Sequence, residues 1–190
     1  MAGYRTIVAD PPWHYERTGI SFTDATSGEF KGTGLPYGTM TVDEIAALPV
    51  GDHADANAHL YLWTTQRYLW DARTIAEVWG FSFVKVLTWC KAPTGFSMGG
   101  TYGNASEFAL FCRRGSLPAQ TRIPRDWWEW PRGAHSAKPE AFLDIVEQVS
   151  PGPYLELFAR RARFGWDYAG DGSLGTVTIP GLRAPEDVAA

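Results

Sequence analysis

Four consecutive residues near the start of the chain have the types that chemistry on an aromatic amine needs. Asp10-Pro11-Pro12-Trp13 follows a short run of mostly apolar and β-branched residues at positions 4–9. Neither proline has an N–H, so the Pro11 carbonyl can project as an acceptor beside the Asp10 carboxylate. Two acceptors can take both protons of an exocyclic amine while the Trp13 ring stacks on the base. The alternative is a rigid strand-to-loop turn, which Asp-Pro-Pro also suits.

Alternating strand and helix patterns place this segment in an α/β domain. Apolar runs predict strands over residues 4–9, 59–64, 82–89, 107–113, 154–158 and 165–169. A capping box at Thr41-Val-Asp-Glu44 predicts a short helix, and helical spacing predicts longer helices over 67–79 and 139–149. This order favours a mostly parallel sheet, with ligands at the carboxyl edge that Asp10 occupies. We expect one domain over residues 1–172 and a weakly ordered tail over 173–190.

The net charge of −4 hides an uneven distribution. Residues 41–80 hold two basic and six acidic side chains, whereas residues 113–138 hold six basic and two acidic ones. The second stretch also contains Trp127, Trp128 and Trp130. Basic and aromatic residues on a loop suit a partner that carries phosphates and bases. An ordinary solvated loop whose tryptophans turn into the core is an equal alternative.

Composition excludes several other classes of protein. Two cysteines, Cys90 and Cys112, cannot form a disulfide framework or a four-thiolate zinc site. The four histidines lack ligand spacing, so we expect no metal. No apolar run approaches the roughly 18 residues of a membrane span, and no signal peptide is recognisable. We therefore expect a cytoplasmic protein without a membrane partner.

The Asp10–Trp13 segment resembles the DPPW signature of an N6-adenine methyltransferase family. That family includes the catalytic subunit of the eukaryotic messenger-RNA adenosine methyltransferase, and bacterial and phage members. Other segments match it in order: Leu35–Glu44, His59–Trp63, His135–Pro139, and Glu156–Arg160 followed by Gly165-Trp166. The resemblance spans about residues 5–172. It implies a Rossmann-like S-adenosylmethionine-dependent methyltransferase fold in permuted (beta-class) motif order, with helices on both faces of a mostly parallel sheet.

The resemblance also implies roles for particular residues. It gives direct methyl transfer from S-adenosylmethionine to the exocyclic amine of adenine, with S-adenosylhomocysteine as product. The catalytic residues would be Asp10, Pro11, Pro12 and Trp13. The cofactor-binding residues would be Asp10, Lys138, Glu156, Leu157, Phe158, Arg160, Arg163 and Asp171. Contact at Asp171 stays open, because family members often carry an amide there and a carboxylate cannot donate. A surface charge is an equal alternative for Arg163.

Substrate contacts are expected on the loops and on the basic stretch. The candidates are Trp13, Tyr15, Tyr37, Arg122, Arg125 and Arg132. DNA is the favoured substrate, and RNA adenosine is the alternative for the same chemistry. A third alternative, a catalytically silent nucleic-acid-binding scaffold subunit, is disfavoured by the intact signature. A homodimer is one way for so small a chain to span a duplex.

Overall fold

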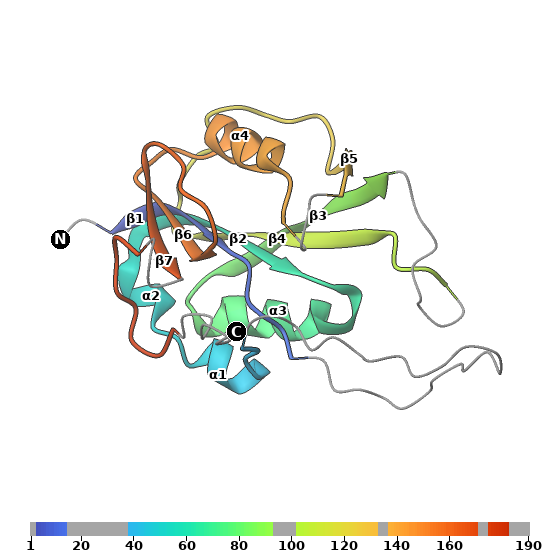
Figure 1. Ribbon diagram of the computed structural model, residues 1–190. Helices are drawn as coiled ribbons and strands as arrows, with labels where there is room; N and C mark the ends of the chain where they lie inside the picture. The colour runs from blue at the N-terminus through green and yellow to red at the C-terminus, as the bar shows by residue number, and fades with distance from the viewer. Residues whose placement is uncertain (1–2, 15–37, 93–101, 133–136, 171–174, 183–190) are drawn as a thin grey trace.

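A seven-stranded sheet forms the centre of the molecule (Figure 1). The structure is a computed structural model that describes residues 3–14, 38–92, 102–132, 137–170 and 175–182. The strands are β1 (Tyr4–Ala9), β2 (Ala54–Thr64), β3 (Ser82–Ala92), β4 (Ser106–Arg114), β5 (Trp127–Pro131), β6 (Tyr154–Ala159) and β7 (Trp166–Gly170). The helices are α1 (Val42–Ala46), α2 (Val50–His53), α3 (Leu69–Val78) and α4 (Glu140–Val149), with a 3₁₀ turn, η1 (Gln66–Tyr68), before α3.

The strand directions create one edge at which a ligand site can form. The strand order is β5-β3-β4-β2-β1-β6-β7. β4 runs antiparallel to β2 and β3, and each of the other neighbouring pairs is parallel. The carboxyl ends of all strands except β4 therefore meet at one edge, which is the usual ligand edge of an open α/β sheet. The predicted α/β fold with a mostly parallel sheet is confirmed, and Asp10 directly follows β1 at this edge.

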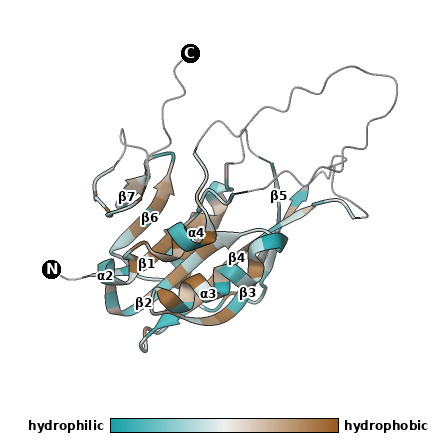
Figure 2. Cartoon of the chain, turned by 90° about the horizontal axis from the view of Figure 1, so that it is seen from below, coloured by the Kyte–Doolittle hydropathy of each residue, from teal (hydrophilic) through white to brown (hydrophobic). Residues whose placement is uncertain are grey.

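Helices cover both faces of the sheet. In Figure 1, α4 lies above the sheet and α1 and α3 lie below it, and we call the two sides the α4 face and the α3 face. Each long helix buries apolar residues at helical spacing. On α3 these are Ala72, Ile75 and Ala76. On α4 they are Phe142, Leu143 and Val146. Figure 2 shows apolar residues concentrated on the strands and on parts of both helices. The sheet thus separates two cores.

Local hydrogen bonds fix the segment after β1 against the start of α1. The predicted capping box is present: the Glu44 N–H donates to Thr41 Oγ1 at 3.2 Å, and the Thr41 N–H donates to Glu44 Oε2 at 2.9 Å. The Met40 N–H donates to the Pro12 carbonyl at 2.9 Å. Trp13 forms a bridge with Met40. The capped helix therefore holds the Asp10–Trp13 segment in place from outside the sheet.

Two elements differ from the sequence expectation. Residues 127–131 form the edge strand β5, parallel to β3, although the basic, tryptophan-rich stretch was expected to be a loop. Alternation of burial along Trp127–Pro131 matches a strand, and Pro131 lies at its end. Part of the expected tail is also ordered, because Ile179 is buried and the Val177 N–H donates to the Tyr168 carbonyl at 2.9 Å. Among the described helices, none has the length and apolar character that a membrane crossing requires.

Candidate active site

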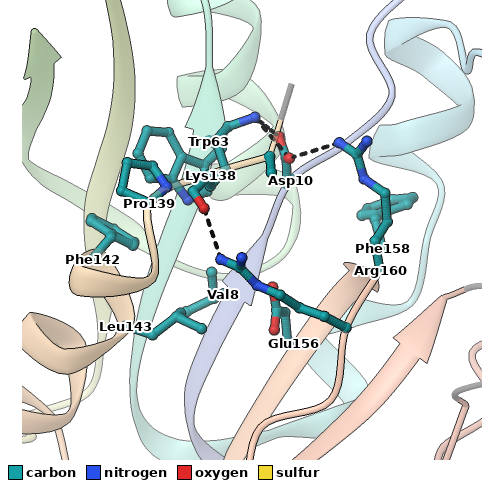
Figure 3. Close-up of a pocket in the computed structure, with 12 residues that line it drawn as sticks. Val8, Asp10, Trp63, Lys138, Pro139, Phe142, Leu143, Glu156, Phe158 and Arg160 are labelled. Atoms are coloured by element: carbon teal, nitrogen blue, oxygen red, sulfur yellow. Dashed lines mark hydrogen bonds and ion pairs between the residues drawn. The ribbon is translucent and has the colours of Figure 1, made fainter. Parts of the chain in front are cut away.

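A pocket opens at the carboxyl edge of the sheet, on the α4 face (Figure 3). It lies between β1, β6 and the segment that leads into α4. Its apolar wall consists of Val8, Trp63, Pro139, Phe142 and Leu143. Its polar lining consists of Asp10, Lys138, Glu156, Arg160 and Arg161. Carboxylates and cations in a partly apolar hollow can bind a ligand that carries both charges and hydroxyl groups.

Lys138 holds the Asp10 carboxylate. Its Nζ lies 2.7 Å from Asp10 and 3.4 Å from Glu107 Oε2, and only 19% of its side chain is exposed. Burial alone would lower the pKa of Lys138, but the Asp10 and Glu107 carboxylates together raise it. Arg160 Nη2 adds a longer contact to Asp10 at 3.7 Å. The ammonium group therefore stays charged and orients Asp10 at the mouth of the pocket, as Figure 3 shows.

Glu107 is a site residue that sequence reasoning missed. It joins two lysines, since it pairs with Lys91 as well as with Lys138. Its only sequence signal is a charge at the start of an otherwise apolar run. The charge alone does not place Glu107 at the site. Because β4 is antiparallel to β2 and β3, the start of β4 lies beside the ends of these strands.

Glu156 offers an acceptor that no described group satisfies. Its Oε2 atom is buried and has no hydrogen-bond partner within the described ranges. Burial raises the pKa of Glu156 to about 7, opposed by Arg161 and reinforced by Asp10. A buried carboxyl oxygen without a donor is costly in a folded protein. A ligand hydroxyl group in this pocket would supply the missing donor.

The raised pKa of Glu156 predicts a pH-dependent stability. In the unfolded chain the Glu156 carboxyl group loses its proton near its ordinary pKa of 4.5, whereas in the folded chain its pKa is about 7. The folded state thus binds more protons between these values, so the stabilising contribution is fully present below 4.5 and is lost as the pH rises through about 7. Urea unfolding measures the free energy of unfolding at about pH 5 and at about pH 8. Between these two values the free energy of unfolding should fall less for Glu156→Gln than for wild type. The exposed Glu129→Gln is the control, and equal losses in all three proteins would contradict the assignment.

The end of β6 turns sharply into the pocket. Phe158 lines the pocket and has a φ of 61°, a left-handed conformation that a residue with a Cβ rarely adopts. The pairing with β7 shifts register at this point, between Leu157 and Ala159. The side chain of Leu157, by contrast, is fully buried in the core of the α3 face. Leu157 can reach a ligand in this pocket only through its backbone.

The structure brings Arg161, and not Arg163, to the pocket. Arg161 Nη2 donates to the Lys138 carbonyl at 2.7 Å, and Arg161 also pairs with Glu140. Arg163 lies against the outside of α4, with its Nη2 2.6 Å from Asp144 and 2.7 Å from Glu147. Three arginines within four positions cannot be told apart by sequence. The packing of this segment on α4 leaves Arg160 and Arg161 at the pocket and directs Arg163 to Asp144 and Glu147.

Trp13 does not present a free ring in this structure. It is 6% exposed, and its indole N–H donates to the Trp63 carbonyl at 3.2 Å. Its ring stacks on Tyr68, with the centroids 4.9 Å apart and the planes at 14°. This core belongs to the α3 face, opposite the pocket. The Pro11 carbonyl is also engaged, because it accepts the Trp13 N–H at 2.9 Å. The second lone pair of that oxygen is what remains for a substrate.

The basic stretch does not form a single patch. Arg113 and Arg114 end β4 at the edge opposite the pocket, and Arg114 Nη1 donates to the Gly51 carbonyl at 2.6 Å. Arg122, Arg125 and Arg132 are exposed, the first two before β5 and the third directly after it. The remaining sequence candidates, Tyr15, Tyr37 and Asp171, lie outside the described residues. Across the described ranges, no group of three or more His, Cys, Asp and Glu side chains comes together as a metal ion would need.

Fold and pocket together define a class: an α/β protein with a Rossmann-like sheet and a charged ligand pocket at its carboxyl edge. The MT-A70 family model matches residues 4–172. The chain therefore belongs to the MT-A70 family. The Asp10–Trp13 segment resembles the signature of the N6-adenine methyltransferases in this family, and membership makes the chain an adenine-N6 methyltransferase. The family prediction is confirmed. Members are generally S-adenosylmethionine-dependent.

Relatives of this chain include bacterial and eukaryotic enzymes. It is 29% identical over 180 residues to the type II methyltransferase M.MunI of Mycoplasma sp, covering 86% of this chain and 75% of the relative. It is 30% identical over 197 residues to a probable N(6)-adenosine-methyltransferase MT-A70-like protein of rice, covering 97% and 25%. It is 26% identical over 181 residues to the human N(6)-adenosine-methyltransferase catalytic subunit METTL3, covering 84% and 26%. The chain thus spans only about a quarter of the rice and human proteins.

Proposed function

We propose that the protein transfers a methyl group from S-adenosylmethionine to N6 of adenine in DNA. The observation that carries the proposal is the Asp10 carboxylate, held by Lys138 at the mouth of a pocket that contains the unsatisfied Glu156 oxygen. The similarity of this chain to a type II methyltransferase, which covers 75% of that relative, supports DNA as the substrate. Relatives named as adenosine methyltransferases support RNA adenosine as the second candidate. The proposal includes a cytoplasmic location and, on duplex DNA, a homodimer.

The pocket residues fit the parts of S-adenosylmethionine. Glu156 would accept from a ribose hydroxyl, which satisfies its buried oxygen. The methionine end carries an ammonium and a carboxylate, for which Asp10 and the cations Lys138 and Arg160 are suitable partners. The apolar wall with Phe158 would pack against the flat or aliphatic parts. When bound, the cofactor supplies an electrophilic methyl group on a sulfonium.

Asp10 has the central role on the substrate side. The N6 nitrogen gains a bond to carbon and a positive charge, while the bond from sulfur to that carbon breaks. A carboxylate fixed beside the amine stabilises the developing charge and accepts its N–H groups. The free lone pair of the Pro11 carbonyl is a second acceptor. The proton that leaves the methylated nitrogen passes to Asp10 or to water, and the neutral amine remains.

A transfer assay with four substrates tests the proposal. Methyl-labelled S-adenosylmethionine is incubated with the protein and matched single-stranded and double-stranded DNA and RNA that contain the same adenines. Label in DNA above label in RNA is expected. Label confined to RNA would replace the DNA proposal by the second candidate. Absence of label from all four would favour the scaffold alternative.

Lys138→Met should weaken S-adenosylmethionine binding. The substitution keeps most of the length of the side chain and removes the cation that orients Asp10 and faces the pocket. Losing a hydrogen bond to a charged group costs about 1.5–3 kcal/mol, or roughly a 10- to 150-fold rise in Kd. Isothermal titration calorimetry measures it. Lys85→Met, which removes an exposed lysine paired with Asp126, is the control. Equal affinity in both variants would refute the assignment of Lys138.

A further inference from the structure

A row of tryptophans and lysines runs from Asp10 to the edge of the sheet. Lys138 Nζ lies 5.4 Å from the centroid of the Trp63 ring, and Trp63 meets Trp89 edge to face at 6.2 Å. Lys91 Nζ lies 5.2 Å from the centroid of the Trp89 ring. Cations over indole faces are stabilising contacts that keep both partners ordered. Because Glu107 pairs with both lysines, the row is continuous with the pocket.

The edge strand β5 continues this row. The Trp89 indole N–H donates to the Trp130 carbonyl at 2.9 Å. The register pairs Trp89 with Trp128 and Lys91 with Trp130, so both β5 tryptophans lie on the α4 face, the face of the pocket. Their rings are parallel, with centroids 5.6 Å apart and an angle of 4° between the planes, and both are half-buried. The intervening side chains of β5 point to the other face.

The charges around the β5 tryptophans favour a phosphate-bearing partner. Lys85 and Lys91 lie on the same face of the neighbouring strand β3, where Lys91 is mostly buried in its pair with Glu107. Lys85 pairs with Asp126, the acid before β5, at 3.1 Å, so these two charges cancel and the positive charge near the tryptophans comes from arginines. Glu129 lies between the tryptophans in sequence and therefore on the opposite face. Exposed arginines flank the strand: Arg122 and Arg125 before it, and Arg132 after it.

We propose that Trp128 and Trp130 form a stacking platform for a base of the strand that carries the target adenine, so that the protein binds an unpaired segment of nucleic acid leading into the pocket. The inference rests on the proposed function and names how its substrate is held. Aromatic rings beside cations are the common means of binding single strands, because every base can stack and every phosphate is charged. A base must leave the duplex stack to lie on these rings, because inside a duplex its two faces are covered by the neighbouring bases.

Binding of a short fluorescein-labelled single-stranded DNA, followed by anisotropy without cofactor, tests the platform. Stacking is worth about 1–3 kcal/mol per base, so Trp128→Ala should raise Kd roughly 5- to 150-fold. Trp127→Ala is the matched control, because Trp127 is 53% exposed on the opposite face of the same strand. It should bind as wild type does. The dependence of Kd on salt should be unchanged in Trp128→Ala, because no charge is removed.

Two further variants keep the test decisive. Trp128→Leu retains apolar bulk for the fold and should lose affinity as Trp128→Ala does, whereas Trp128→Phe should recover most of it. Unchanged binding in a folded Trp128→Leu protein, or an equal loss in Trp127→Ala, would overturn the platform. The proposed chemistry is judged separately by the transfer assay. Binding that depends on Trp128 without adenine methylation would retain the platform and reject the chemistry.

Discussion

Asp10→Asn is expected to slow methyl transfer by roughly 10²–10³-fold, the usual cost of removing a group that stabilises charge in a transition state. The amide keeps the shape of the side chain but loses the negative charge that faces the substrate amine. The substitution also replaces the ion pair between Lys138 and Asp10, which are 2.7 Å apart in the wild type, with a contact to a neutral amide. Asp10→Ala should abolish the activity. Single-turnover rates with saturating cofactor and DNA measure the effect.

The fold should survive the Asp10 substitutions. Lys138 keeps Glu107 as a partner, and the side chain of Asp10 lies in the pocket rather than in either core. Circular dichroism and urea unfolding should therefore give curves close to those of wild type. Asp52→Asn, which changes an exposed carboxylate on α2, is the matched control and should keep the full rate. Turnover by Asp10→Asn within a few-fold of this control would contradict the role given to the carboxylate.

Trp13→Ala is expected to lower the free energy of unfolding by about 3–5 kcal/mol, as large-to-small changes in a core do. The ring is 6% exposed, stacks on Tyr68 and donates to the Trp63 carbonyl. Removing the ring leaves a cavity on the α3 face of the sheet, and the Trp63 carbonyl loses its hydrogen-bond donor. Equilibrium urea unfolding measures the change, with Trp13→Phe expected to recover part of it.

An exposed tryptophan gives the comparison for Trp13. Trp70 is 74% exposed on α3, so Trp70→Ala should change the stability by no more than about 0.5 kcal/mol. If Trp13→Ala were as stable as this control and only the KM for DNA rose, Trp13 would be a stacking residue for the base and not a core residue. The sequence favoured that stacking role, because an aromatic ring beside two acceptors fits an adenine pocket.

Much of the fold could be predicted because local signals agreed with the tertiary structure. The capping box at Thr41, the apolar stripe of α4 and the β-branched run of β1 each specify an element by themselves. The position of Asp10 then follows from a general rule, that parallel strands meet their ligands at the carboxyl edge. Lys138, Glu156, Phe158 and Arg160 were identified by resemblance, and all four line the same pocket as Asp10.

The features that were missed depend on non-local packing. β5 is a strand because β3 offers it an edge, whereas its own sequence, rich in tryptophan and bounded by prolines, also suits a loop. Glu107 reaches the site only because β4 is antiparallel. Arg161 and Arg163 both pair with acids of α4, but Arg161 pairs with Glu140 at the start of the helix beside the pocket, whereas Arg163 pairs with Glu147 farther along it. A pattern of residue types contains none of these relations between distant segments.

The most direct test of the central claim is the chemical identity of the product. DNA incubated with the protein and S-adenosylmethionine is digested to nucleosides and analysed by mass spectrometry against authentic methylated standards. The proposed function predicts N6-methyldeoxyadenosine, formed by wild type and absent with Asp10→Ala. A methyl group on cytosine, on a ring nitrogen of adenine or on no base, or an N6-methyl product that persists in Asp10→Ala, would contradict the account.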